Sequence, residues 1–193
     1  KLLQEGHWEA QKKFWEAEIR TWIEPEIPYR GEVPTKFPYL GRICKFSVTS
    51  DLVDELKNTA KRNGVSLFSL VLCSWQLTLK TFSPSQRVCL MVMNANRSGL
   101  DTQAILGFMV NSLLINQEIL DETPISQTLK NTYIKLRAAL KNQDYPWQIL
   151  YLSQNIDQRR CFKIAFNWID QPNFLELQKT ITLRESLSDH HYL

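Results

Sequence analysis

Apolar residues recur at the spacing of an α-helix in several parts of this chain. Trp8, Trp15 and Trp22 are each seven residues apart, which is almost two helical turns, so they share one stripe of a helix predicted over residues 2–22. An aromatic stripe of this kind is typical of a docking face. Each further predicted helix begins at a capping serine or an initial proline: Ser50, Ser66, Pro124 and Pro146.

Other segments show the patterns of β-strands. Residues 88–93 are continuously apolar, and a run without alternation fits a strand covered on both faces, as in parallel or mixed α/β sheets. Further strands are predicted over residues 42–48, 110–119 and 161–168. Residues 24–41 are rich in proline and glycine, which indicates an extended connector. Helices that alternate with apolar strands predict an α/β fold, a layered mixed sheet with flanking helices.

The composition is that of an ordinary globular protein. Of the 193 residues, 44% are hydrophobic and 22% are charged, which fits one domain or one large lobe of a larger domain. The net charge of +3 is small and the lysines and arginines are scattered, so we expect no nucleic-acid partner. No apolar run approaches the roughly 20 residues of a membrane span, and no secretory pattern is seen. We therefore expect a cytoplasmic protein without a membrane partner.

No sequence pattern for metal or cofactor chemistry is found. The 4 cysteines lie far apart without a Cys-x-x-Cys pair, which predicts reduced core thiols at Cys44, Cys73, Cys89 and Cys161. Zinc-ligand spacing, a Gly-rich phosphate loop and a Gly-x-Ser-x-Gly elbow are all missing. We therefore expect neither a metal nor a bound cofactor.

Short motifs follow one another in the order and at the spacing of one known family. Residues 94–97 read Asn-Ala-Asn-Arg, residues 106–112 read Leu-Gly-Phe-Met-Val-Asn-Ser, and residues 142–147 read Asn-Gln-Asp-Tyr-Pro-Trp. Together with the Trp-rich helix, they resemble the condensation domains of non-ribosomal peptide synthetases over about residues 8–170. The chain departs from the family at Asn142 and Trp147, where His and Phe are common. It departs again at residues 157–162, where an Arg-Asp-x-Ser-Arg-Asn-Pro-Leu motif is expected.

The resemblance implies a chloramphenicol-acetyltransferase-like fold of two lobes, of which this chain would be the C-terminal lobe. Residues 1–41 would form an entry helix and a Pro-rich connector, residues 42–193 the lobe itself, and the N-terminal lobe would be absent. The family's catalytic His-His-x-x-x-Asp-Gly motif belongs before the Trp-rich helix. His190 and His191 follow the last predicted strand instead, so we expect no catalytic residue in this chain. The Trp stripe and the apolar strands are expected to need the absent lobe for burial.

The same resemblance implies an acyltransferase of secondary-metabolite biosynthesis. Such a domain forms an amide bond between a carrier-bound acyl or aminoacyl thioester and a carrier-bound aminoacyl acceptor. The expected partners are the N-terminal lobe and peptidyl carrier proteins, whose phosphopantetheine arms hold the substrates. Residues expected to face the substrate tunnel are Gly107, Phe108, Val110 and Asn111. Residues expected at the lobe interface or in a structural role are Asn96, Arg97, Gln143 and Asp144.

The residue types leave some of these roles open. The Asn111 carboxamide both donates and accepts hydrogen bonds, so it can orient a reacting group or tie down a turn. Gly107 permits a positive φ or a close backbone approach, which suits a tunnel wall and a simple turn equally. Arg97 can bind a carboxylate across the lobe interface or remain a solvated charge at a strand end.

Two further functions are compatible with the motifs. One is a catalytically inactive condensation-like module that docks carrier proteins or tailoring enzymes, which the changes at Asn142 and near Arg159 favour. The other is a related acyltransferase or an epimerase on the same fold, although Val110 and Asn111 are of the condensation type. An intact or a broken His motif upstream of Lys1 would separate condensation from docking.

Overall fold

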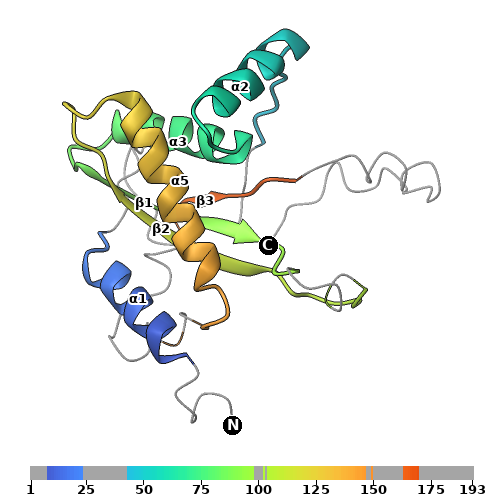
Figure 1. Ribbon diagram of the computed structural model, residues 1–193, viewed down its shortest axis with the longest axis vertical. Helices are drawn as coiled ribbons and strands as arrows, with labels where there is room; N and C mark the ends of the chain where they lie inside the picture. Colours follow the sequence, from blue (N-terminus) through green and yellow to red (C-terminus); the bar gives the residue numbers. More distant parts are fainter. Residues whose placement is uncertain are drawn as a thin grey trace.

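The described part of the chain is a small mixed sheet with helices packed around it. The computed structural model describes residues 8–23, 43–97, 102, 104–146, 149 and 163–169. Its elements are α1 (Glu9–Arg20), α2 (Ser50–Arg62), α3 (Leu67–Lys80), β1 (Arg87–Asn94), β2 (Asn111–Glu118), α5 (Ile125–Lys141) and β3 (Ala165–Phe166). In the sheet, β1 lies between β2, with which it pairs antiparallel, and β3, with which it pairs parallel (Figure 1). The predicted α/β fold with a mixed sheet and flanking helices is confirmed.

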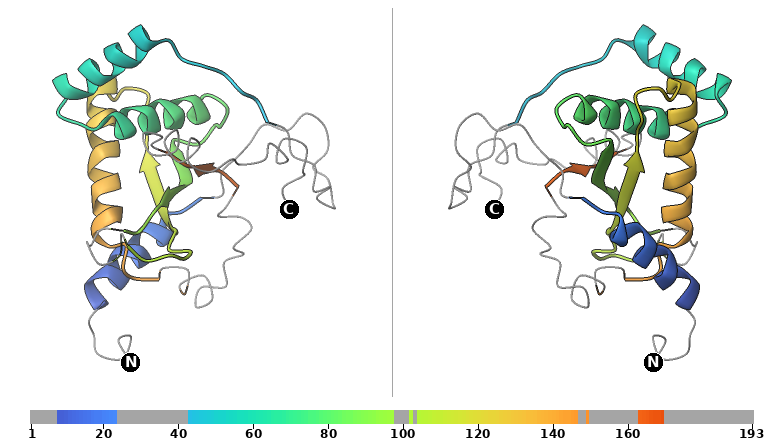
Figure 2. Two further views of the ribbon diagram at one scale, coloured as in Figure 1. Left: turned by 90° about the vertical axis from the view of Figure 1, so that its right-hand side faces the viewer. Right: turned by 90° about the vertical axis from the view of Figure 1, so that its left-hand side faces the viewer.

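Both faces of the central strands are buried. Leu90 and Met91 are adjacent in β1, and each has 0% of its surface exposed. Neighbouring residues of a strand point to opposite faces, so the sheet is covered on both sides, as the continuous apolar run predicted. Helix α5 packs against β2 and α3, and α2 packs on α3 farther from the sheet (Figure 2).

Helices α1 and α5 reach the edge strand β2 from opposite faces. Asn116 Nδ2 donates to the Glu18 carbonyl of α1 at 2.9 Å, whereas its neighbour Gln117 donates through Nε2 to the Thr128 carbonyl of α5 at 3.3 Å. Adjacent side chains of a strand alternate between faces. An ion pair of 2.7 Å between Glu18 and Lys135 then links the two helices directly. Helix α1 is therefore a full part of this core.

The starts of α2, α3 and α5 lie within one residue of those predicted, whereas the helix predicted over residues 2–22 spans Glu9–Arg20 among the described residues. Helix α3 is capped as expected, because the Ser66 hydroxyl accepts from the Ser69 amide at 3.1 Å. The N-cap of α2 lies one residue earlier than expected: the Thr49 hydroxyl, not that of Ser50, accepts from the Leu52 amide, at 3.4 Å. Both residues are hydroxyl-bearing, so the sequence pattern alone does not choose between them.

The strand predicted over residues 42–48 is not formed in residues 43–48, which pair with no described strand. Ile43 is 76% exposed and Phe46 is 84% exposed. An apolar segment forms a β-strand only where a neighbouring strand supplies its hydrogen-bond partners. Cys44 lies in the same segment and is exposed, so the prediction of a core thiol is wrong there. It is confirmed for Cys73 and Cys89, which are buried.

The last strand is shorter than predicted and spans Ala165–Phe166 within the expected residues 161–168. The predicted connector, residues 24–41, lies outside the described residues, as does Cys161 and most of the helix expected from Pro146. Within the described residues, no helix is long and apolar enough to cross a lipid bilayer.

The expectation that the Trp stripe needs another lobe for burial is wrong. Trp15 is 0% exposed, and Trp8 and Trp22 pack against the same core cluster. The reason is that α1 lies against β2 and the end of α5, which together cover the stripe. The central strands are likewise buried within this chain.

We predict that Trp15→Phe lowers the free energy of unfolding by about 1–3 kcal/mol, because the indole N–H donates a partly buried hydrogen bond that Phe cannot replace. Urea unfolding of the isolated chain, followed by circular dichroism, measures this change. Trp75→Phe is the matched control, because Trp75 is 41% exposed, and it should cost less than about 0.5 kcal/mol. Equal losses in the two variants would contradict the prediction.

Candidate functional site

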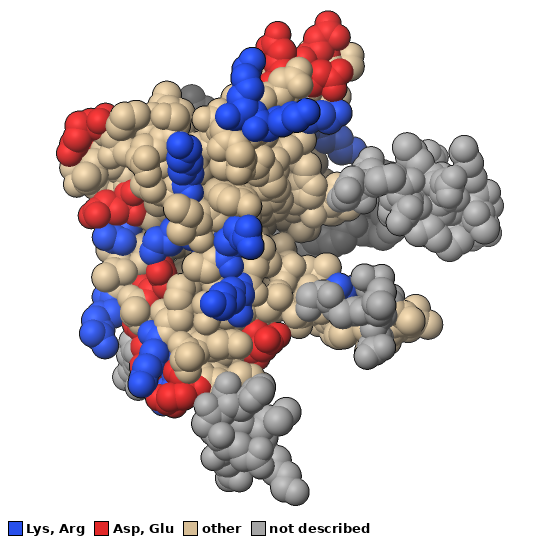
Figure 3. Space-filling model, in the orientation of Figure 1, with Lys and Arg blue, Asp and Glu red and all other residues tan. Residues whose placement is uncertain are grey.

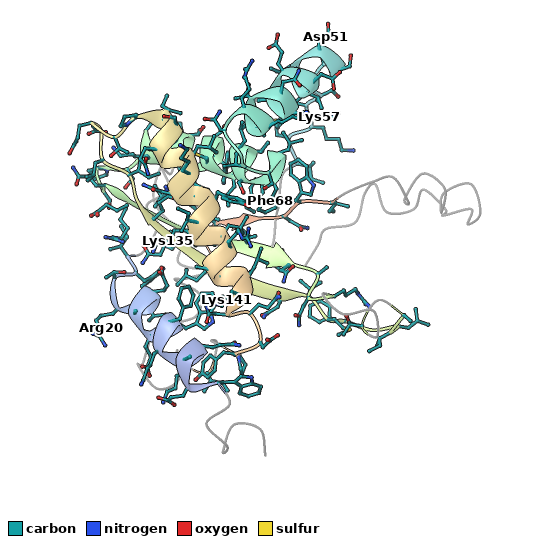
Figure 4. The ribbon with its side chains drawn as sticks, in the orientation of Figure 1. Arg20, Asp51, Lys57, Phe68, Lys135 and Lys141 are labelled. Carbon is teal, nitrogen blue, oxygen red and sulfur yellow. The ribbon has the colours of Figure 1, made fainter. Side chains whose placement is uncertain are left out.

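The predicted motif residues come together at one end of the sheet. Asn94 ends β1 and Asn111 begins β2, and the two stand opposite each other in the antiparallel pairing. Helix α5 ends at Lys141 (Figure 4), and residues 142–146 then turn toward these strand ends. Three motifs that are far apart in the sequence therefore meet at one place.

Side-chain amides join the strand ends to this turn. Asn94 Nδ2 donates to Gln143 Oε1, and Asn111 Nδ2 donates to the Gln143 backbone carbonyl at 2.9 Å. The other half of the Asn111 carboxamide accepts from the Ser112 amide at 2.9 Å. Both halves of this side chain are thus bonded to backbone of the same chain. The geometry favours the turn-supporting alternative for Asn111, and its part in the reaction stays a prediction.

Helix α1 holds the same turn with its own side chains. Trp15 Nε1 donates to the Asn142 carbonyl at 2.8 Å, and the Tyr145 amide donates to Gln11 Oε1 at 2.9 Å. The rings of Trp8 and Tyr145 meet edge to face with their centroids 6.3 Å apart. Burial raises the pKa of the Tyr145 phenol, so this ring stays uncharged at neutral pH.

An open hollow of about 460 Å³ lies beside the turn. Its lining consists of Asn96, Phe108, Met109, Val110, Asn111, Gln143, Asp144 and Pro146. It thus combines residues that the sequence analysis assigned to the tunnel with residues assigned to the interface. Arg97 and Gly107 do not line it. Met109 and Pro146 were missed, although both belong to the quoted motifs, and the reaction roles of all these residues stay predictions.

The segment that leads into the hollow is held by Arg97. Its guanidinium donates to the backbone carbonyls of Thr102, Ile105 and Gly107 at 2.7, 2.7 and 3.0 Å. These bonds fit neither role predicted for Arg97, which were to bind a carboxylate across the lobe interface or to remain a solvated charge. Gly107 has φ 152°, and nothing lies within 4 Å of where its Cβ would be, so of the two alternatives left open for it the positive φ is the one observed.

The lining can form hydrogen bonds, but it offers little proton chemistry. Asp144 is the sole ionisable residue among the described lining residues, and it is exposed. Carboxamides and backbone groups donate and accept hydrogen bonds without changing charge. The hollow is therefore suited to orienting a polar ligand.

On the face seen in Figure 3, Lys and Arg are interspersed with Asp and Glu, without one large patch of a single sign.

Several residues discussed in the sequence analysis lie outside the described part of the chain: Trp147, His190, His191 and residues 157–162. Among the described residues, no group of three or more His, Cys, Asp or Glu side chains could hold a metal ion. Burial raises the pKa of the Cys73 thiol, and a weaker effect of its hydrogen bond with Thr132 opposes this, so the buried sulfur stays protonated.

Comparison with known proteins gives one consistent result. The family model described as a condensation domain matches residues 1–187. Malpibaldin synthetase of Mortierella alpina is 26% identical over 200 residues, which cover 98% of this chain and 4% of that protein. Gramicidin S synthase 2 of Brevibacillus brevis is 28% identical over 194 residues, which cover 94% of this chain and 4% of that protein. The chain therefore spans a small part of the length of these relatives.

Solved structures show the same fold. A holo four-domain nonribosomal peptide synthetase bound to AMP and glycine superposes with a TM-score of 0.79 at 20% identity, over 89% of this chain and 13% of that chain. The first condensation domain of the CDA synthetase gives a TM-score of 0.65 at 12% identity, over 88% of this chain and 36% of that chain. The X-domain from teicoplanin biosynthesis gives a TM-score of 0.76 at 11% identity, over 84% of this chain and 39% of that chain. At such identities these likenesses establish the fold.

We predict that Gln143→Ala destabilises the chain by about 1–3 kcal/mol, because the Asn94 amide loses its acceptor in a partly buried site. Asp144→Ala is the matched control in the neighbouring, exposed position, and it should change stability by less than about 0.5 kcal/mol. The midpoints of urea unfolding of the two variants measure the difference. If Asp144→Ala cost as much as Gln143→Ala, the hydrogen-bonded turn would not be the cause.

Proposed function

The chain belongs to the condensation domain family, and we propose that it forms one wall of the reaction tunnel in an amide-forming domain of a non-ribosomal peptide synthetase. The observation that carries this proposal is the hollow of about 460 Å³ at the ends of β1 and β2. Residues from three separate motifs line it, and membership of the family supplies the class of reaction.

The proposed reaction joins two carrier-bound substrates. The amine of the aminoacyl acceptor attacks the thioester carbonyl of the donor, so that a C–N bond forms and a C–S bond breaks. The donor's phosphopantetheine arm leaves as a free thiol, and the attacking nitrogen loses one proton. The lining suits such an arm, because Asn96 and Gln143 are polar like its amides, while Phe108 and Val110 offer apolar surface.

We assign orientation, not proton transfer, to the described residues of this chain. Positioning two reactants in the correct geometry is itself a large part of catalysis, since it removes the entropy cost of bringing them together. In this proposal, the His motif of the N-terminal lobe handles the amine proton. The turn of residues 142–146 and the start of β2 hold the opposite wall rigid through the bonds of Asn94 and Asn111.

We predict that the isolated 193-residue chain makes no dipeptide from loaded donor and acceptor carriers, whereas the full-length polypeptide that contains it does. Mass spectrometry of the carrier-bound products measures both reactions against a no-enzyme background. Dipeptide formation by the isolated chain would contradict the division of roles. A full-length polypeptide that binds loaded carriers without forming an amide would support the docking module instead.

We predict that Asn111→Ala in the full-length polypeptide lowers the melting temperature of this domain and reduces the turnover of the folded fraction less than about ten-fold. The reason is that its carboxamide already bonds the Gln143 carbonyl and the Ser112 amide, and losing such a bond costs about 1–3 kcal/mol. Melting and single-turnover rates are measured on one preparation. A larger rate loss at unchanged stability would instead place Asn111 in contact with a reacting group.

A further inference from the structure

The loop that leads into β2 presents apolar side chains to solvent. Leu106 is 100% exposed, Phe108 is 90% exposed, and Ile105 is 48% exposed. In Figure 1 this segment projects from the end of the sheet beyond the neighbouring helices. Burial in the core does not hold such a loop, because its apolar side chains contribute little packing energy there. Its conformation must therefore depend on other contacts.

Arg97 supplies these contacts through one planar group. Nη1 donates to the carbonyls of Thr102 and Ile105, both at 2.7 Å, and Nη2 donates to the carbonyl of Gly107 at 3.0 Å. Three carbonyls within six residues therefore converge on one cation. Hydrogen bonds from a charged donor are shorter and stronger than neutral ones. Among the described residues, no carboxylate forms an ion pair with this guanidinium, so its charge is directed at the loop backbone.

The backbone at both ends of this arrangement is constrained as well. Asn96 has φ 52°, a left-handed conformation that few residues other than Gly, Asn and Asp adopt easily. Gly107 has φ 152°, which disfavours a side chain at that position. The chain therefore turns immediately before Arg97 and again at the last carbonyl that Arg97 binds. The described residues of the loop, Thr102 and 104–110, therefore have a defined shape although the apolar side chains among them are exposed.

We propose that Arg97 is a positioning residue for the amide-forming reaction: it preorganises Thr102 and residues 104–107 so that Phe108 and Val110 stand in place at the hollow before substrate arrives. This inference rests on the proposed function for its kinetic part and on geometry alone for its structural part. A wall that is already ordered does not lose conformational entropy when substrate binds, so apparent substrate affinity increases. The fork of donors is essential, because a lysine ammonium offers its three donors from one nitrogen, whereas Arg97 reaches the three carbonyls from two separate nitrogens.

The test uses the full-length polypeptide with Arg97→Lys and Arg97→Ala. Arg62→Lys is the matched control, since Arg62 donates one hydrogen bond of 3.0 Å to Thr59 on the exposed surface of α2. Chymotrypsin cleavage after Leu106 and Phe108 reports loop opening. We expect cleavage at least ten-fold faster in both Arg97 variants, with unchanged melting temperature, and no change in Arg62→Lys.

Kinetics of amide formation decide the functional part. We expect KM for the carrier-bound acceptor to rise about ten-fold in both Arg97 variants while kcat falls less than about three-fold, because the loop contributes to binding in ground and transition states alike. Wild-type cleavage in Arg97→Lys overturns the inference, since charge without the fork would then suffice. Faster cleavage with unchanged KM overturns the positioning role.

The two proposals fail in different ways. If the wild-type polypeptide makes no amide, the proposed function fails, and the cleavage rates alone decide whether Arg97 holds the loop. If the wild-type polypeptide is active but Arg97→Ala and Arg97→Lys retain its cleavage pattern and KM, only the inference about Arg97 fails. If the melting temperature of Arg97→Lys falls enough to explain its faster cleavage, the variant has lost global stability. The inference that Arg97 acts locally on the loop is then wrong.

Discussion

The carbonyl groups at the end of α5 have no continuing helical amides to accept from, as at the end of any helix. Trp15 of α1 and Asn111 of β2 donate to the carbonyls of Asn142 and Gln143, and Gln11 of α1 accepts from the Tyr145 amide. Each bond satisfies a main-chain group of residues 142–145 and also ties α1 or β2 to this turn. The candidate site depends on this constraint, since the hollow lies where the turn meets the strand ends.

The register of the sheet is set by polar side chains within a largely apolar layer. Asn116 bonds α1 on one face, while Gln117 bonds Thr128 and accepts from the Thr132 hydroxyl of α5 at 2.9 Å on the other. A slip of one residue would exchange the two faces and leave both buried carboxamides without partners. The same register places Asn111 opposite Asn94 at the far end of the strands. Polar contacts at one end of β2 thereby position the site at the other.

The sequence predicted what depends on local pattern and missed what depends on distant backbone. Helices α1, α2, α3 and α5 and the doubly buried strand β1 follow from the spacing of apolar residues, and they were predicted correctly apart from their ends. The strand expected at residues 42–48 failed because pairing requires a partner strand, which no local pattern reveals. The resemblance to the family assigned Phe108, Val110 and Asn111 to a tunnel, and these three residues line the hollow, but their role there stays a prediction. The contacts of Arg97 could not be predicted, because its partners are carbonyls, which every residue carries.

Apolar side chains are buried around Trp15 and exposed around Phe108. Two different kinds of interaction stabilise these two regions. Trp15 is held by packing and by its bond to the turn, so the stripe to which it belongs is part of a finished core. Phe108 has almost no packing, and its loop keeps its shape through charge-assisted bonds from Arg97 to the backbone. In the proposed function this surface receives substrate and has to stay uncovered, so burial cannot order it. Because Arg97 orders the loop by bonding its backbone carbonyls, the apolar side chains of the loop remain available for contact.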